Sequence, residues 1–165
     1  MPPESNAGLD YQIDQAISSQ LSPRTLSLED AARLAEYARD AADESAVPIV
    51  FSLVDSRGQQ RYFFSMDNAL LISHTLAGQK AWTAVALKMP TQQLAGQIQP
   101  GASLYGLHHE PGICGIGGGL PCWSNGILLG AIGISGGSVD EDIAIASAAL
   151  ARFSRERFPL TIFPE

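Results

Sequence analysis

The stretch CGIGGGLPCWSNGILLGAIGISGGSVDEDIAIASAAL, residues 114–150, decides the fold. Asn125-Gly126 is a strong hairpin-turn signal, and the apolar run Ile127–Ile134 that follows it predicts a central strand. Ser138 predicts the cap of a helix over Val139–Phe153, and the helix dipole stabilises the acidic residues of its first turn. The stretch therefore predicts a hairpin followed directly by a helix.

The chain upstream of this stretch repeats the pattern in the opposite order. Ser27 followed by Asp30 resembles a capping box and predicts the start of a helix with one apolar stripe. The runs Ile49–Val54 and Arg61–Met66, joined by the turn Asp55–Gly58, predict a second hairpin. A helix and a hairpin therefore precede the central region.

Between the two hairpins the sequence predicts one long buried helix. Residues 67–88 are apolar on almost all sides, with Asp67 or Asn68 as the expected cap. Pro90 ends this helix, and 91–97 predicts a short one. The glycine-rich segment 113–123 predicts strands separated by bulges or tight turns.

This order of elements predicts an α+β fold. Hairpin-joined strands imply a mainly antiparallel sheet of five strands, and helices on both faces make an α/β/α sandwich. The 165 residues suit a single domain, which we place at 25–165. Residues 1–24 form an extension with weak helical spacing, for which a helix docked on the body or on a neighbour and a disordered segment both remain open, and we favour the docked helix.

Composition excludes several classes of function. The net charge of −7 and the scattered arginines argue against nucleic acid and anionic membrane surfaces. No apolar run is long enough to span a membrane, and no signal peptide is recognisable, so we expect a cytoplasmic protein. Cys114 and Cys122 match neither a redox pair nor a zinc motif, and we expect reduced thiols.

Three stretches together resemble one known family. They are LSLEDAARLAEYARDAADESAVPIVFSLVDSRGQ, LISHTLAGQKAWTAVALKMP and the quoted segment 114–150, with its GGG-L-P and G-A-I-G-I-S-G-G elements. They resemble the GlcG/HbpS family, which also includes the C-terminal domain of PduO. The resemblance covers roughly residues 26–153.

This resemblance implies a profilin-like fold and homo-oligomers, often tetramers or octamers. It also implies a tetrapyrrole ligand, haem or corrinoid, and a link to B12-dependent diol or glycerol utilisation. The adenosyltransferase domain of a full PduO protein is absent from this sequence, so that chemistry is not carried over.

Histidines are the first candidates for a ligand site. His74 lies in the long helix beside small residues that leave room for a flat macrocycle, and imidazole ligates haem iron. His108 and His109 lie in a loop with Glu110, and one of them is the second choice as a ligand to iron or another metal. The metal candidates are therefore His74, His109 and Glu110, whereas the alternative roles are a subunit contact for His74 and a solvated loop for the others.

Lys80 and the run Gly117, Gly118 and Gly119 complete the candidate binding residues. A buried lysine in this helix is either a reactive amine or, as we favour, the partner of Asp140, Glu141 or Asp142. The glycines either leave space for a flat ligand or an anion or, more simply, allow close approach of the backbone.

Three functions remain in competition at this point. The favoured one is a non-catalytic, oligomeric tetrapyrrole-binding protein with a planar ligand at a subunit contact. The second is an assembly protein without a cofactor. The third is an enzyme acting on a small oxidised metabolite through Lys80, Glu110 and Cys114. The letters GxSxG at residues 133–137 do not indicate a hydrolase, because a short antiparallel context is wrong for that motif.

Overall fold

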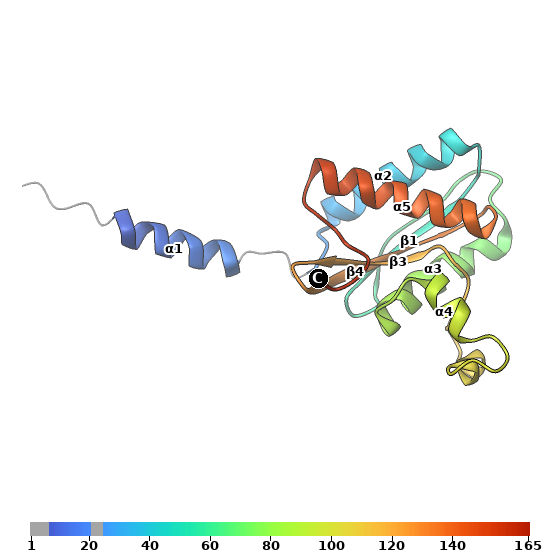
Figure 1. Cartoon of the computed structure of the whole chain (residues 1–165). Coiled ribbons are helices and arrows are strands. Elements are labelled where there is room, and N and C mark those ends of the chain that lie inside the picture. The colour runs from blue at the N-terminus through green and yellow to red at the C-terminus, as the bar shows by residue number, and fades with distance from the viewer. Residues whose placement is uncertain (1–6, 21–24) are drawn as a thin grey trace, which may run out of the picture.

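The computed structural model describes residues 7–20 and 25–165. Residues 25–165 fold around one antiparallel sheet (Figure 1). The strands lie in the order β2-β1-β4-β3. The elements are α1 (Ala7–Gln20), α2 (Leu28–Ser45), β1 (Val50–Asp55), β2 (Gln60–Ser65), α3 (Leu71–Leu87), α4 (Thr91–Gln97), a 3-10 turn η1 (Tyr105–His109), β3 (Gly119–Ser124), β4 (Ile127–Ser135) and α5 (Val139–Glu156).

Helices cover both faces of the sheet, as the sequence predicts. α2 and α5 lie on one face, and α3 lies on the other (Figure 1). The predicted α+β sandwich is therefore confirmed. Both predicted N-caps of the outer pair are also confirmed, because Ser27 and Ser138 each accept a hydrogen bond from the backbone three residues on and form complete capping boxes.

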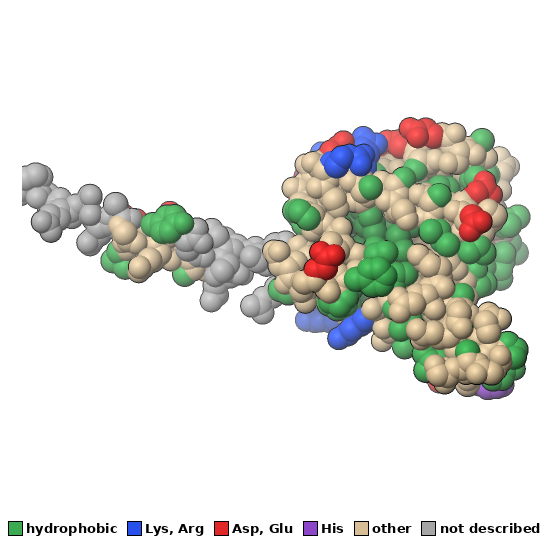
Figure 2. Space-filling model, viewed as in Figure 1, with side chains coloured by type: hydrophobic (Ala, Val, Ile, Leu, Met, Phe, Trp, Pro, Cys, Tyr) green, Lys and Arg blue, Asp and Glu red, His purple; other side chains and the backbone are tan. Residues whose placement is uncertain are grey.

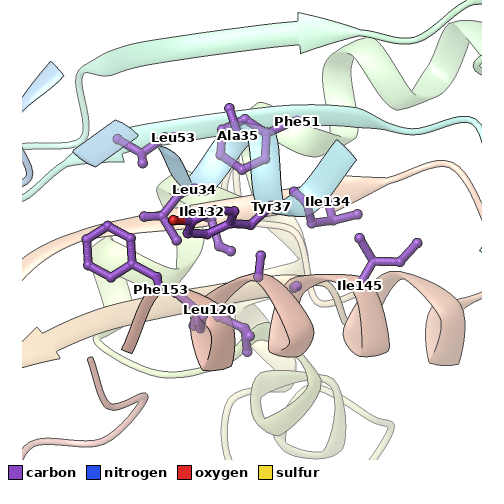
Figure 3. Close-up of a cluster of buried hydrophobic side chains, with 14 of the residues drawn as sticks. Leu34, Ala35, Tyr37, Phe51, Leu53, Leu120, Ile132, Ile134, Ile145 and Phe153 are labelled. Carbon is purple, nitrogen blue, oxygen red and sulfur yellow. The ribbon is translucent and has the colours of Figure 1, made fainter. Parts of the chain in front are cut away.

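The main core fills the space between the sheet and the α2–α5 pair. Side chains from both helices and from the two central strands point toward one another in this layer (Figure 3). Phe51 of β1 is fully buried and stacks on Phe64 of β2, with ring centroids 5.3 Å apart. The layer against α3 contains smaller side chains, such as Ala81, Ala84 and Ala131, so α3 approaches the sheet closely.

The sheet has four strands, and the expected fifth strand is wrong. Residues 113–118 do not pair as a strand, because Gly112 and Gly118 take positive φ values of 88° and 123° that turn the chain. The Gly118 carbonyl still accepts a hydrogen bond from Ile134 N at 2.9 Å. The glycines therefore make a tight approach to β4 instead of an additional strand.

The start of the long helix also differs from expectation. α3 begins at Leu71 and has no side-chain cap, so Asp67 and Asn68 are wrong as capping residues. Asn68 has a φ of 68°, a left-handed conformation that asparagine tolerates, and it turns the chain before the helix can start. The first turn of α3 exposes Leu71 and Ile72, whereas Ser73 beside them is buried.

The N-terminal extension contains the helix α1, which stands apart from the body in Figure 1. Leu9, Ile13 and Ile17 are each about half exposed, at 52%, 46% and 50%. The remainder of the extension, residues 1–6 and 21–24, lies outside the described residues. None of the helices in the described part of the chain has the length and hydropathy that crossing a bilayer requires.

Gly133 of β4 tests the close approach of α3. A Cβ at this position would overlap the Ala77 carbonyl oxygen and lie 2.7 Å from Ala81 N, both backbone atoms of α3. We expect Gly133→Ala to lower the free energy of unfolding by about 1–3 kcal/mol, because the backbone of α3 would have to shift to make room for the Cβ. Gly96→Ala is the control, because a Cβ there meets nothing within 4 Å. Urea unfolding that gave equal stabilities for the two variants would contradict this packing.

A polar cluster holds α2 against α5. The Tyr37 hydroxyl donates to Glu156 Oε2, and Arg152 Nε lies 3.3 Å from Glu156 Oε1. Arg152 also covers the Tyr37 ring, with its guanidinium carbon 4.2 Å from the ring centroid. The hydrogen bond from Tyr37, with help from Arg152, holds the pKa of Glu156 below its ordinary value.

This lowered pKa makes stability depend on pH. A carboxyl that binds its proton less tightly in the folded state stabilises the fold above its unfolded pKa of about 4.3, and that contribution is lost as pH falls through the folded pKa. We expect Glu156→Gln to lower the melting temperature near pH 7 and to change it much less near pH 3. Glu44→Gln, an exposed position on α2, is the control. An equal loss for Glu156→Gln at both pH values would contradict the argument.

Candidate functional site

The beginning of α3 and the edge strand β2 together expose an unusual amount of apolar surface. Its members are Phe63, Leu70, Leu71, Ile72 and the imidazole of His74, and we call this set the α3–β2 surface. Leu71 is 88% exposed, and Leu70 and Ile72 are 59% and 57% exposed. Large aliphatic side chains gathered at this exposure mark a binding or association surface.

His74 lies in this surface, and its ring contacts both the backbone of α3 and a neighbouring aromatic ring. Its Nδ1 lies 3.2 Å from the carbonyl oxygen of Leu71, and its ring centroid is 6.2 Å from that of Phe63. A carbonyl can only accept, so in the neutral ring this contact favours the tautomer with the proton on Nδ1 and the lone pair on Nε2. An exposed imidazole held in this tautomer is competent to ligate iron, because the same second contact orients histidine ligands in metal sites generally.

The histidines of the loop are placed differently. His108 Nε2 lies 2.6 Å from the Ile98 carbonyl, and its ring packs edge-on against Tyr105. His109 and Glu110 are exposed at the end of η1. Within residues 7–20 and 25–165, no group of three or more His, Cys, Asp or Glu side chains is placed to hold a metal ion. His74, His109 and Glu110 thus do not form one metal centre within a single protomer.

Lys80 is committed to the fold. Its side chain is 1% exposed, and Nζ lies 3.0 Å from Asp142 Oδ2 and 2.9 Å from the carbonyl oxygen of Ile134. The other carboxylate oxygen, Asp142 Oδ1, accepts a hydrogen bond from Gly137 N at 2.9 Å. The ion-pair role predicted for Lys80 is therefore confirmed with Asp142 as its partner, and the ammonium group faces the protein interior instead of a ligand.

Other parts of the protein occupy the space beside the three candidate glycines. A Cβ on Gly117 would meet Ile143 and Val139, and one on Gly118 would lie 3.0 Å from Lys80 Nζ. The N–H of Gly119 donates to Thr91 Oγ1 at 2.9 Å. The space beside these residues is occupied by α3, α4 and α5, which supports the role of close backbone approach over that of a ligand cradle.

The two thiols are poor nucleophiles in this fold. Burial raises the pKa of Cys114, and it raises the pKa of Cys122 to about 12. Cys114 is 4% exposed, and Lys80 is paired with Asp142. These residues therefore do not form, with the exposed Glu110, a reactive set in which a base faces a nucleophile.

Sequence reasoning missed Phe63 and the residues around a groove between α2 and β2. Phe63 is signalled by the alternation along Arg61–Met66, where every second side chain faces one side of the sheet. The groove has no such signal, because its two walls, which include Ala32 and Tyr62, meet only after the sheet has formed.

A family model described as "Haem degrading protein HbpS-like" matches residues 26–151. The chain belongs to the HbpS-like family. The match covers nearly all of the sheet and its helices, so the resemblance noted in the sequence, including that to the PduO C-terminal domain, is confirmed.

Relatives of this HbpS-like chain include larger proteins. It is 45% identical over 136 residues to the corrinoid adenosyltransferase PduO of Salmonella typhimurium, an alignment that covers 81% of this chain and 40% of that protein. The chain thus spans less than half the length of that relative. It is also 41% identical to an uncharacterised 15.0 kDa protein of the dhaT-dhaS intergenic region of Citrobacter freundii, covering 79% of this chain and 93% of the other.

Solved structures show the same HbpS-like fold. A crystal structure of a PduOC:heme complex matches with a TM-score of 0.79 and 42% identity, covering 84% of this chain and 99% of that one. A variant of HbpS from Streptomyces reticuli matches with a TM-score of 0.73 and 32% identity, covering 78% and 86% of the two chains. Both structures therefore share the fold of this chain.

The buried ion pair gives a direct test of its structural role. We expect Lys80→Met to cost about 3–5 kcal/mol of unfolding free energy, because it leaves the Asp142 carboxylate buried without a counter-ion. The double variant Lys80→Met with Asp142→Leu should recover much of that loss in urea unfolding. Lys88→Met, which removes an exposed ammonium at the end of α3, is the control. A single variant as stable as the control would contradict the assignment.

Proposed function

We propose that this HbpS-like protein binds haem on the α3–β2 surface and that His74 is the axial ligand. The observation that carries the proposal is the His74 ring, whose Nδ1 contact with Leu71 leaves Nε2 as an iron ligand in the middle of exposed apolar side chains. The PduOC:heme complex of a relative supports the same class of ligand.

The chemistry of the surface fits the cofactor. Phe63, Leu71 and Ile72 offer apolar contact to a porphyrin ring, and covering such area is worth roughly 25 cal/mol per Å². The first turn of α3 lacks a side-chain cap, so its N–H groups and partial positive charge favour the propionates. When bound, haem would supply the redox and ligand-binding chemistry of its iron, and the chain would supply the ligand and the apolar bed.

The surface also gives a reason for assembly. The α3–β2 surface of one chain covers only one face of a planar ring. The other face stays in contact with water unless a second apolar surface covers it. A second copy of this chain offers an identical apolar surface, so we propose that ligand binding and homo-oligomerisation, as tetramers or octamers, occur at the same place. An assembly protein without cofactor remains the second candidate, because exposed leucines at this density also suit a simple subunit contact.

The cellular role that we propose is accessory to B12-dependent use of diols or glycerol in the cytoplasm. The relative named PduO and the relative from the dhaT-dhaS intergenic region support this setting. Corrinoid is the alternative tetrapyrrole, supported by the name of PduO. Adenosyl transfer is not proposed, because the chain matches 40% of that protein.

Titration with hemin tests the proposal. The wild-type chain should give a saturable Soret shift, and His74→Ala should weaken binding by at least roughly tenfold, about 1.4 kcal/mol, since it removes the iron ligand. His109→Ala is the matched control, because this histidine is also exposed but lies on η1. The same titration with a corrinoid separates the two macrocycles.

Two outcomes would contradict the proposal in different ways. A saturable shift that His74→Ala leaves unchanged would remove His74 as the ligand but leave haem binding in place. No saturable shift with hemin, combined with a large particle in light scattering, would favour the assembly protein without a cofactor.

A further inference from the structure

The side of α3 that faces away from the sheet carries no lysine, arginine, aspartate or glutamate. Lys80 is the one such residue among the 17 of this helix, and it is buried in the ion pair with Asp142. The sequences of α2 and α5 are rich in charged residues, and Figure 2 shows charged side chains along these two helices at the top of the body. A helix at a water-exposed surface ordinarily has a charged outer face, so α3 has the composition of a helix that is covered on both sides.

Large and small side chains alternate along this outer side. Residues spaced by three or four lie on one face of a helix, and here they are Leu71, Thr75, Gly78, Trp82 and Ala86. Gly78 is half-buried and the other four are exposed. The outer side of α3 therefore presents two large apolar side chains separated by small residues.

Trp82 is held in place on this face by the turn between β1 and β2. A Cβ on Gly58 of that turn would lie 2.9 Å from the indole, so the ring packs directly against the turn backbone. The indole is nevertheless 39% exposed. A fixed aromatic ring with this much free surface is typical of the centre of a protein contact.

The order of the side chains fits a second copy of α3 that runs in the opposite direction. If the midpoint lies between Gly78 and Gln79, Leu71 comes level with the partner's Ala86, and Thr75 comes level with the partner's Trp82. A large side chain then meets a small one at each contact, and the glycine near the centre lets the two backbones approach closely. A two-fold axis generates every contact twice, as the interface of a symmetric dimer requires.

The exposed area is sufficient for such a dimer. Phe63, Leu70 and Ile72 of the α3–β2 surface lie beside Leu71 and add to the face. Large apolar side chains at these exposures each offer on the order of 100 Å² to a partner. Two copies would thus bury about 1,000 Å² in total, the size that a specific interface needs.

Charge favours this face as the meeting point of two copies. Each chain has a net charge of −7, so two copies repel each other when charged faces approach. The outer side of α3 avoids this repulsion, because none of its side chains carries a formal charge when His74 is neutral. A second copy is therefore a suitable occupant in both shape and charge.

We propose that two copies of the chain pair through α3, antiparallel, about a two-fold axis beside Gly78 and Gln79. This pairing assigns residues to the subunit contact of the proposed function and rests on that contact, but it does not require haem. His74 lies toward β2, with its ring 6.2 Å from that of Phe63, so the imidazole stays at the edge of the helix pair.

Cysteine substitution in the full-length chain, without hemin, tests the arrangement. Gln79→Cys places a thiol beside the axis, where it should form a disulfide with its counterpart under mild oxidation. Thr75→Cys is the matched control on the same face, because the antiparallel arrangement separates its two copies by about 10 Å along the helices, beyond the reach of a disulfide. Cys114 and Cys122 are buried and do not compete. Gln79→Cys should close at least roughly tenfold faster than the control.

A charge exchange tests the register by sedimentation, again without hemin. Ala86→Glu places a carboxylate against the partner's Leu71 and should weaken dimer association at least roughly tenfold. Adding Leu71→Lys places an ammonium group opposite that carboxylate and should restore most of the association. Both positions are exposed within one chain, and urea unfolding checks that each variant is folded.

Three results would overturn the pairing. They are equal closure rates for the two cysteine variants, a dimer that Ala86→Glu leaves unchanged, and a wild-type chain that stays monomeric. None of these results bears on haem binding by His74, which the hemin titration tests separately.

Discussion

The buried ion pair between Lys80 and Asp142 is the constraint on which the rest of the structure depends. Lys80 comes from α3 on one face of the sheet, and Asp142 comes from the first turn of α5 on the other. The pair closes at the end of β4, where the Ile134 carbonyl accepts a further hydrogen bond. A charge this deeply buried requires its partner, so both helices are fixed relative to the sheet.

This constraint explains the glycine-rich sequence. Gly118 leaves room for the Lys80 ammonium and for Asp142, and Gly119 leaves room for the backbone of α3 at Lys80. Gly133 allows the same helix to approach β4 one turn earlier. The glycines that could have cradled a ligand are therefore used to let α3 approach the sheet. The exposed apolar residues Leu71 and Ile72 lie at the N-terminal end of α3, in the turn that also carries His74.

Local signals predicted most of the fold. Ser27 and Ser138 begin α2 and α5 because capping needs only neighbouring residues, and Asn125-Gly126 forms the predicted turn between β3 and β4. The predictions of a fifth strand and of the start of α3 were wrong, because both depend on backbone conformations at Gly118 and Asn68 that tertiary packing selects. Periodicity reports which residues are apolar, but not where a glycine turns the chain.

The candidate site was predicted less completely, for a physical reason. His74 could be named from its helix, and the acidic partner of Lys80 could be narrowed to three neighbours. Phe63 was missed although the alternation along β2 signals it. The residues that line the groove between α2 and β2 have no such signal, because elements distant in the sequence bring them together. The central claim is that the imidazole of His74 is the iron ligand on the α3–β2 surface. A crystal structure of the chain grown with hemin tests it most directly. The account predicts iron bound to Nε2 of His74, with the ring against Phe63 and Leu71, and iron bound by any other residue while His74 stays unligated would contradict it.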